Sequence, residues 1–130
     1  GHGTGDSVLK EFCLVVQRCI RSTDILARWG GEEFVVLMPE TSIVQALDII
    51  RRLQRELTKA FFMANNDRLV LTFSAGVAAC GTEETEIEII DRADRAMYAA
   101  KMAGKNRVFA ANENGVDEEG NNSFHDIPLL

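Results

Sequence analysis

The stretch ILARWGGEEFVVLM, residues 25–38, decides the fold of this chain. Residues 25–29 and 34–38 each form a short apolar run of the kind found in strands. Two glycines and two glutamates lie between these runs, and paired glycines in that position are typical of a hairpin turn. Glycine also lets another molecule approach the backbone closely, because it has no Cβ. The sequence therefore predicts a hairpin with two carboxylates, Glu32 and Glu33, at its turn.

These two carboxylates offer hard oxygen ligands at the edge of a sheet. Mg²⁺ is commonly held by one or two carboxylates together with the phosphates of a substrate. For an isolated match, a tight turn with solvated acids is the simpler interpretation. Motifs elsewhere in the chain favour the metal site.

The remaining elements follow from periodicity, caps and turn residues. Helices are predicted over residues 6–20, 42–59 and 86–103, and further strands over residues 69–78 and 106–111. Asp6 stands at the expected N-cap of the first helix, and Gly104 follows the third as a C′ glycine. This order predicts an α+β fold, with a mixed, partly antiparallel sheet and helices packed on it.

The 130 residues are enough for one domain with a sizeable core. We predict that this domain covers residues 1–111, and that residues 112–130 form a polar, acidic tail rich in Asn, Gly and acids. Trp29, Phe34 and Tyr98 are predicted to be core residues.

The net charge of −6 provides no global field that would attract nucleic acid or an anionic membrane. The three cysteines, Cys13, Cys19 and Cys80, lie in apolar stretches without metal-ligand spacing, which favours small buried residues in a reducing compartment. No apolar run is long enough to span a bilayer, and the N-terminus lacks a signal-peptide pattern. We expect a cytoplasmic domain without direct membrane contact, although its parent protein could be membrane-anchored.

Five short motifs stand in a fixed order along the chain. They are GHGTGD at residues 1–6, RSTD at 21–24, RWGGEEF at 28–34, ADRAMYAAK at 93–101 and GKNRV at 104–108. Each alone is weak, but in this order and spacing they closely resemble the GGDEF domain of bacterial diguanylate cyclases, in its Glu-containing GGEEF form. The output domain of PleD-type response regulators is the most similar variety, and the resemblance covers residues 1 to about 110.

The resemblance implies a nucleotidyl-cyclase or palm-like sandwich that condenses two GTP molecules into cyclic di-GMP and releases pyrophosphate. It implies a homodimer in which each domain holds one GTP, with two Mg²⁺ or Mn²⁺ ions per active site. It also implies a role in two-component signalling through a bacterial second messenger, with an upstream receiver or sensor domain in the parent protein.

Residue roles follow from the same resemblance. Glu32 matches the family's metal-binding acid and proton acceptor. Glu33 matches its catalytic neighbour, a supporting ligand or alternative base, and a solvated carboxylate is the alternative interpretation for Glu33. Gly30 and Gly31 match the substrate-binding turn. Asp6 matches the residue that accepts hydrogen bonds from guanine N1–H and the N2 amino group, which adenine does not offer as a pair.

Two further groups of charged residues have matches in the family. Lys101 and Lys105 match residues that contact terminal phosphates, although the second is normally Arg; complementing a helix dipole is the alternative role. Arg21 and Asp24 match an RxxD inhibitory product site that Arg52 completes. A surface ion pair of little energetic value is the alternative.

The family's first strand and first helix, with a second metal ligand, a Lys and an Asn, have no counterpart in this sequence. We expect either that they belong to a longer protein or that another chain fills the gap. The first hypothesis is therefore an active cyclase domain. The second is a non-catalytic cyclic di-GMP receptor that uses the RxxD site, and a generic nucleotidyltransferase palm comes third.

Overall fold

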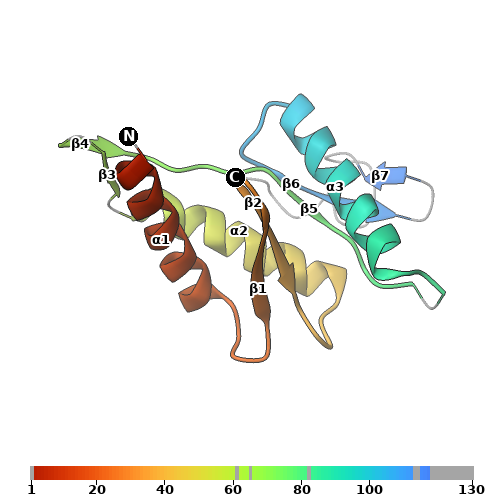
Figure 1. Ribbon diagram of the computed structural model, residues 1–130. Helices are drawn as coiled ribbons and strands as arrows, with labels where there is room; N and C mark the ends of the chain where they lie inside the picture. The colour runs from red at the N-terminus through yellow and green to blue at the C-terminus, as the bar shows by residue number, and fades with distance from the viewer. Residues whose placement is uncertain (1, 61, 65, 82, 113–114, 118–130) are drawn as a thin grey trace.

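The computed structural model describes residues 2–60, 62–64, 66–81, 83–112 and 115–117 (Figure 1). The elements are α1 His2–Cys19, β1 Ile25–Gly30, β2 Glu33–Leu37, α2 Ile43–Lys59, β3 Phe62–Ala64, β4 Asp67–Leu69, β5 Ala75–Val77, α3 Glu86–Met102, β6 Val108–Asn112 and β7 Gly115–Asp117. The predicted α+β class is confirmed.

The described strands form three small sheets in place of the single mixed sheet that was predicted. β1 pairs with β2 and β3 with β4, both antiparallel, whereas β6 lies between β5, to which it is parallel, and β7, to which it is antiparallel. The continuous strand predicted over residues 69–78 is wrong, because β4 ends at Leu69 and β5 begins only at Ala75. Residues 70–74 run between them without a ladder partner among the described strands.

α2 is the central helix of the core and packs on both sides. Toward α1 it buries Leu53 and Leu57 against Val16 and Cys19. Toward β6 it buries Leu47 and Ile50, which contact the inward-facing residues Val108 and Ala110.

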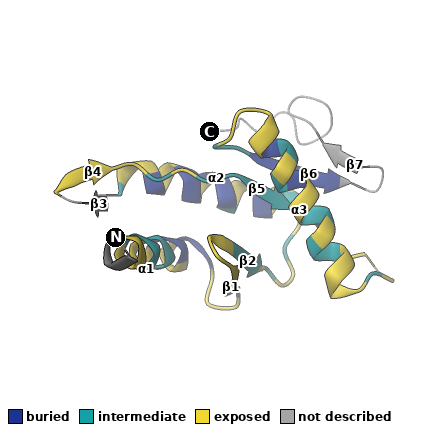
Figure 2. Cartoon of the chain, turned by 45° about the horizontal axis from the view of Figure 1, so that its top comes forward, coloured by how far each residue is buried: buried dark blue, intermediate teal, exposed yellow. Residues whose placement is uncertain are grey.

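β6 is covered on both faces. Its alternate residues Phe109 and Ala111 pack against Ala96 and Ala100 of α3, as the period of two in a strand requires. β6 is therefore sandwiched between α2 and α3, and its residues 108–111 are all buried (Figure 2).

The helix termini test the capping predictions. Ser42 is the N-cap of α2 and exchanges side-chain and backbone hydrogen bonds with Gln45, which confirms the predicted start of this helix. Gly104 has a φ of +128° after the C-cap of α3 at Ala103, as expected for a C′ glycine. The N-cap prediction for Asp6 is wrong, because α1 begins at His2 and Asp6 lies in its second turn.

Other predictions also need correction. Trp29 and Tyr98 are 58% and 63% exposed and are not core residues, and Cys80 is exposed as well. β3 was not predicted, and β7 lies inside the predicted polar tail, where it pairs with β6. Residues 118–130 of that tail lie outside the described residues. No helix in the described part of the chain is long and apolar enough to cross a membrane.

Candidate active site

The β1–β2 turn carries the two predicted carboxylates. Gly31 has a φ of +45°, a left-handed conformation that favours glycine, so the pair of glycines has a backbone reason. Glu32 and Glu33 are exposed, and no hydrogen bond or ion pair engages either carboxylate within the described structure. Both are therefore available to a ligand.

Arg28 holds this turn from the β1 side. Its guanidinium donates from Nε and Nη2 to the carbonyl oxygen of Gly31, at 2.9 and 2.6 Å. Two N–H groups of one guanidinium can donate to the same oxygen, and this contact ties the turn to β1. The backbone of the turn, from which the two carboxylates extend, is thereby held to the strand.

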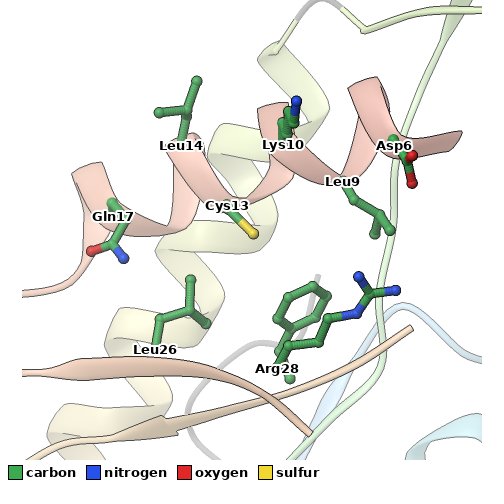
Figure 3. Close-up of a pocket in the computed structure, with 9 residues that line it drawn as sticks. Asp6, Leu9, Lys10, Cys13, Leu14, Gln17, Leu26 and Arg28 are labelled. Carbon is green, nitrogen blue, oxygen red and sulfur yellow. The ribbon is translucent and has the colours of Figure 1, made fainter. Parts of the chain in front are cut away.

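The hairpin lies against α1. The ring of Phe34 in β2 packs on Phe12 of α1 with centroids 5.2 Å apart. Beside this contact is a hollow of about 600 Å³ between α1 and the hairpin (Figure 3). Its lining residues are Asp6, Leu9, Lys10, Cys13, Leu14, Gln17, Leu26, Arg28 and Phe34.

Helical spacing explains the α1 side of this hollow. The six lining residues of α1 recur at intervals of three and four, so they lie on one face of the helix. Figure 3 shows the guanidinium of Arg28 reaching toward the end of the hollow where Asp6 lies. The lining is mainly apolar, with one carboxylate, Asp6, and two cations, Lys10 and Arg28, which is the composition of a small-molecule site for an anionic ligand.

The donor set at the turn fits a hard divalent cation of the kind that substrate phosphates help to hold. The described residues contain no cluster of three or more His, Cys, Asp or Glu side chains that could enclose an ion alone. Two adjacent, unengaged carboxylates supply instead part of a coordination sphere. Mg²⁺ is often bound in this incomplete way, with water and phosphate oxygens as the other ligands.

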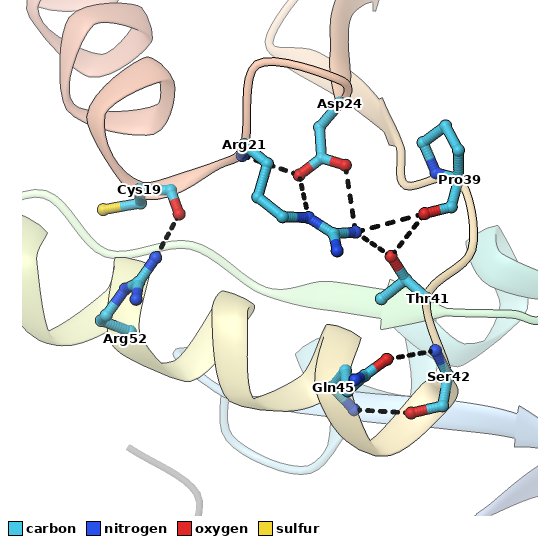
Figure 4. A network of polar contacts seen from close by, with 8 residues as sticks. All are labelled: Cys19, Arg21, Asp24, Pro39, Thr41, Ser42, Gln45 and Arg52. Atoms are coloured by element: carbon cyan, nitrogen blue, oxygen red, sulfur yellow. Dashed lines mark hydrogen bonds and ion pairs between the residues drawn. The ribbon is translucent and has the colours of Figure 1, made fainter.

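The predicted RxxD residues are brought together at the base of the hairpin (Figure 4). Asp24 accepts a hydrogen bond from the backbone N–H of Arg21 at 2.8 Å and an ion-pair contact from its Nη2 at 3.4 Å. The same Nη2 donates to the carbonyl of Pro39 at 3.2 Å and to the hydroxyl of Thr41. Arg21 thus joins the residues before β1 to the residues after β2.

Burial separates the roles of the two RxxD residues. The side chain of Asp24 is 0% exposed, whereas that of Arg21 is 47% exposed. In this conformation Asp24 orients the guanidinium, and a ligand would meet Arg21. Arg52 of α2 donates to the carbonyl of Cys19 in the last turn of α1, so it lies at the same helix end as the RxxD residues.

The two lysines lie at the C-terminal end of α3. Lys101 is in the last turn of α3 and Lys105 follows the helix with a φ of 64°; both are exposed. No hydrogen bond or ion pair between either lysine and Glu32 or Glu33 is present in the described residues. Their predicted contact with terminal phosphates stays a prediction.

Sequence reasoning missed Arg28 and Lys10 as lining residues of the hollow. Lys10 lies four residues after Asp6, so the helical period alone placed both on one face. The sequence contains no comparable pattern for Arg28, because an arginine in a strand near a glycine turn is usually interpreted as an ordinary surface residue.

Comparisons with known proteins point to one family. A family model for "Diguanylate cyclase, GGDEF domain" matches residues 1–107. Diguanylate cyclase A of Treponema denticola is 35% identical over 115 residues, which are 88% of this chain and 31% of that protein. The response regulator PleD of Caulobacter vibrioides is 40% identical over 111 residues, or 83% of this chain and 24% of PleD.

The fold is also similar to a solved structure. The GGDEF domain of DgcB from Caulobacter crescentus, in complex with c-di-GMP, has a TM-score of 0.79 and 31% identity, and the match covers 85% of this chain and 66% of that one. The chain therefore spans about a third or less of the two curated relatives, and about two thirds of the solved chain.

Proposed function

Because the chain belongs to the GGDEF family of diguanylate cyclase domains, we propose that it condenses two GTP molecules into cyclic di-GMP and releases pyrophosphate. The observation that carries the proposal is the hollow between α1 and the hairpin, with Asp6 at one end and the Glu32–Glu33 turn on the strand pair that forms its wall. A guanine base and its phosphates need such neighbours.

Asp6 recognises the guanine base of GTP. A carboxylate accepts hydrogen bonds from both N1–H and the N2 amino group of guanine, and the apolar side chains of the lining offer a surface on which the base can pack. Adenine lacks this pair of donors, so the proposal includes preference for GTP over ATP.

The phosphates lie along the turn, where Gly30 and Gly31 leave the backbone accessible. Glu32 and Glu33 would hold Mg²⁺ or Mn²⁺, two ions per active site, and Glu32 also accepts a proton. The bound metal supplies charge neutralisation at the phosphates. Lys101 and Lys105 bind the terminal phosphates. The protein contributes mainly positioning, because phosphoryl transfer asks little covalent chemistry of the side chains.

Two domains are needed, because each holds one GTP and the 3′-hydroxyl of one nucleotide attacks the α-phosphate of the other. We propose a cytoplasmic bacterial homodimer that works in two-component signalling, with a receiver or sensor domain upstream. PleD is by name a response regulator, which supports this setting.

The test is turnover of GTP and ATP, with Mg²⁺ or Mn²⁺, by the chain extended upstream by one strand and one helix, beside Glu32→Gln and the control Glu11→Gln on an exposed part of α1. We expect cyclic di-GMP from GTP alone and none from ATP. Glu32→Gln should lower the rate on the order of 10²-fold or more, because a charge that faces the phosphates is lost while the shape is kept. The control should retain the full rate.

A Glu32→Gln protein with the activity of the control would remove the metal assignment. If the unaltered protein binds cyclic di-GMP but makes none, the second hypothesis, a non-catalytic receptor, becomes the better description. The half-exposed Arg21, already oriented by Asp24, is the observation that favours this second function.

We further propose that Arg21, Asp24 and Arg52 bind the product and inhibit the enzyme. Arg21→Ala should weaken binding of cyclic di-GMP about ten- to hundredfold, as for the loss of a hydrogen bond to a charged group, and should leave the initial rate unchanged. Calorimetric titration measures the affinity, and Arg55→Ala on the exposed side of α2 is the matched control. Equal affinities of the two variants would return Arg21 and Asp24 to the status of a surface ion pair.

A further inference from the structure

The outward face of α3 carries three large exposed apolar side chains. Ile87, Tyr98 and Met102 are 77%, 63% and 70% exposed. They are spaced by 11 and 4 residues, close to three turns and one turn, so they lie on one face. Ala96 and Ala100 on the opposite face are fully buried against β6. These three side chains, called the apolar stripe below, therefore lie on the solvent side of the helix, with Ile87 toward its N-terminus, Tyr98 and Met102 toward its C-terminus and Asp91 on the same face between them.

The charges on this solvent side are divided along the helix axis. Its exposed acids lie toward the N-terminus and its exposed bases toward the C-terminus: Glu86, Glu88, Asp91 and Asp94, then Arg95, Lys101 and, just beyond the helix, Lys105. Arg95 donates to Asp91 at 2.9 Å where the two halves meet. A helix with this division complements an antiparallel copy of itself, and a parallel copy would bring like charges together.

We propose that this face of α3 binds the same face of a second copy of the chain in antiparallel orientation. Ile87 of one copy then packs near Met102 and Tyr98 of the other, at both ends of the contact. The acidic half of each helix faces the basic half of its partner. The apolar side chains at both ends of the contact are thereby removed from water.

The surface is separate from the hollow between α1 and the hairpin, and only its basic end, with Lys101 and Lys105, is shared with the proposed phosphate contacts. α3 and α1 lie at opposite ends of the molecule in both whole-chain views (Figures 1 and 2). A copy bound on α3 leaves the hollow between α1 and the hairpin accessible. One helix face is small beside the roughly 800 Å² per partner of a standard interface, so the association is weak and depends on concentration.

Cysteine cross-linking tests the geometry in the protein as its gene encodes it. In the double variant Ile87→Cys, Met102→Cys the two positions are 15 residues apart on one helix, about 22 Å. A disulfide needs Cα atoms within about 7 Å, so any bond between positions 87 and 102 joins two copies. We expect mild oxidation to give a covalent dimer in which mass spectrometry identifies this cross-linked peptide pair.

The matched control is Val44→Cys, Arg55→Cys, a pair of exposed positions 11 residues apart on α2. The amount of covalent dimer that this control forms measures cross-linking by random collision. The α3 pair should exceed it at least about tenfold, and Arg95→Glu in the α3 background should reduce that excess, because the basic half of the contact is weakened. Melting curves of each variant identify any loss of fold.

Three results would overturn the proposal. The first is an 87–102 bond that is no more frequent than the control bond. The second is a majority of 87–87 and 102–102 bonds, which would mean a parallel pair, and the third is an excess that Arg95→Glu leaves unchanged in a folded protein. A tail segment or another protein that covers the stripe would give the first of these results. The assay requires no GTP, so it stands whether or not the chain is a cyclase.

Discussion

Gly76 in β5 sets how closely α3 approaches the sheet. A Cβ at this position would lie 1.9 Å from the carbonyl oxygen of Ala93 and 2.5 Å from the backbone nitrogen of Met97. Both atoms belong to the helix backbone, which no side-chain rotation can move. The glycine therefore permits the contact that buries Ala96 and Ala100.

We expect Gly76→Ala to destabilise the protein by about 1–3 kcal/mol, the usual cost of overpacking. Denaturant unfolding followed by circular dichroism gives the change in the free energy of unfolding. Gly5→Ala is the control, because a Cβ at Gly5 meets nothing within 4 Å and alanine is the better helix former. If both variants unfold at the same denaturant concentration, the close approach of α3 has no energetic weight.

At the residue level the sequence predicted that Glu32 and Glu33 lie at the turn of a hairpin, as observed, whereas the guanine contact of Asp6 stays a prediction. It could not predict that Arg51 and Gln54 of α2 are buried, since both residue types are usually solvent-exposed. The exposure of Trp29 could not be predicted either. Trp29 is the extra residue of β1 at an irregularity in the β1–β2 pairing, between Arg28 and Gly30. Such a β-bulge has no reliable signature in one sequence.

At the scale of elements, the N-terminus of α3 is held by an ion pair. Arg92 donates from Nε to Oε2 of Glu84 at 2.7 Å and from Nη2 to Oε1 at 2.6 Å. Glu84 also accepts the backbone N–H of Gly81 at 2.9 Å, and Arg92 reaches the carbonyl of Ala79. The hydrogen bond from Arg92 lowers the pKa of Glu84.

A carboxyl group whose pKa is lowered in the folded protein stabilises the fold above its unfolded pKa, and this contribution is lost as the pH falls through the folded pKa. We therefore expect Glu84→Gln to be less stable than the unaltered protein at pH 7, with the difference shrinking as the solution is acidified. Thermal melts across that range measure it.

The neighbouring exposed residue provides the control for this experiment. Glu83→Gln should keep the stability of the unaltered protein at every pH, because no partner of its carboxylate is present in the described residues. A Glu84→Gln deficit that does not change with pH would mean that geometry, and not the charge, stabilises this corner.

Predictability differed between elements for physical reasons. α2 was predicted to within a residue, because its cap and its apolar stripe are both local features. The strand over residues 69–78 was not, since strand formation depends on a partner, and residues 70–74 have none in the described structure.

At the scale of the whole molecule, β2 and β5 each have an unpaired edge in the described structure. β2 pairs only with β1, and β5 only with β6, among the described strands. Partly buried apolar residues from both sides, among them Val36 and Phe73, pack on the same core cluster. Unpaired edges beside apolar side chains invite association with other chains.

We therefore expect residues 1–130 alone not to form a soluble, active monomer. A protein extended upstream by one strand and one helix should melt cooperatively and convert GTP, because an added strand can satisfy both edges. Melting curves and cyclic di-GMP assays of the two proteins compare them. A cooperative, monomeric and active 130-residue chain would contradict the expectation.

The register of the β1–β2 hairpin also limits how this region can change in evolution. Leu26 lies opposite Val36, and Arg28 opposite Phe34, with the single extra residue Trp29 before the turn. Inserting or deleting one residue in either strand would turn its following side chains to the other face. A compensating insertion in both strands would restore the pairing, but it would turn the side chains between the insertions and the turn to the other face and carry the carboxylates about 3.3 Å farther from Arg21. Natural relatives that retain the function should therefore differ here by substitution, while loops elsewhere are free to vary in length.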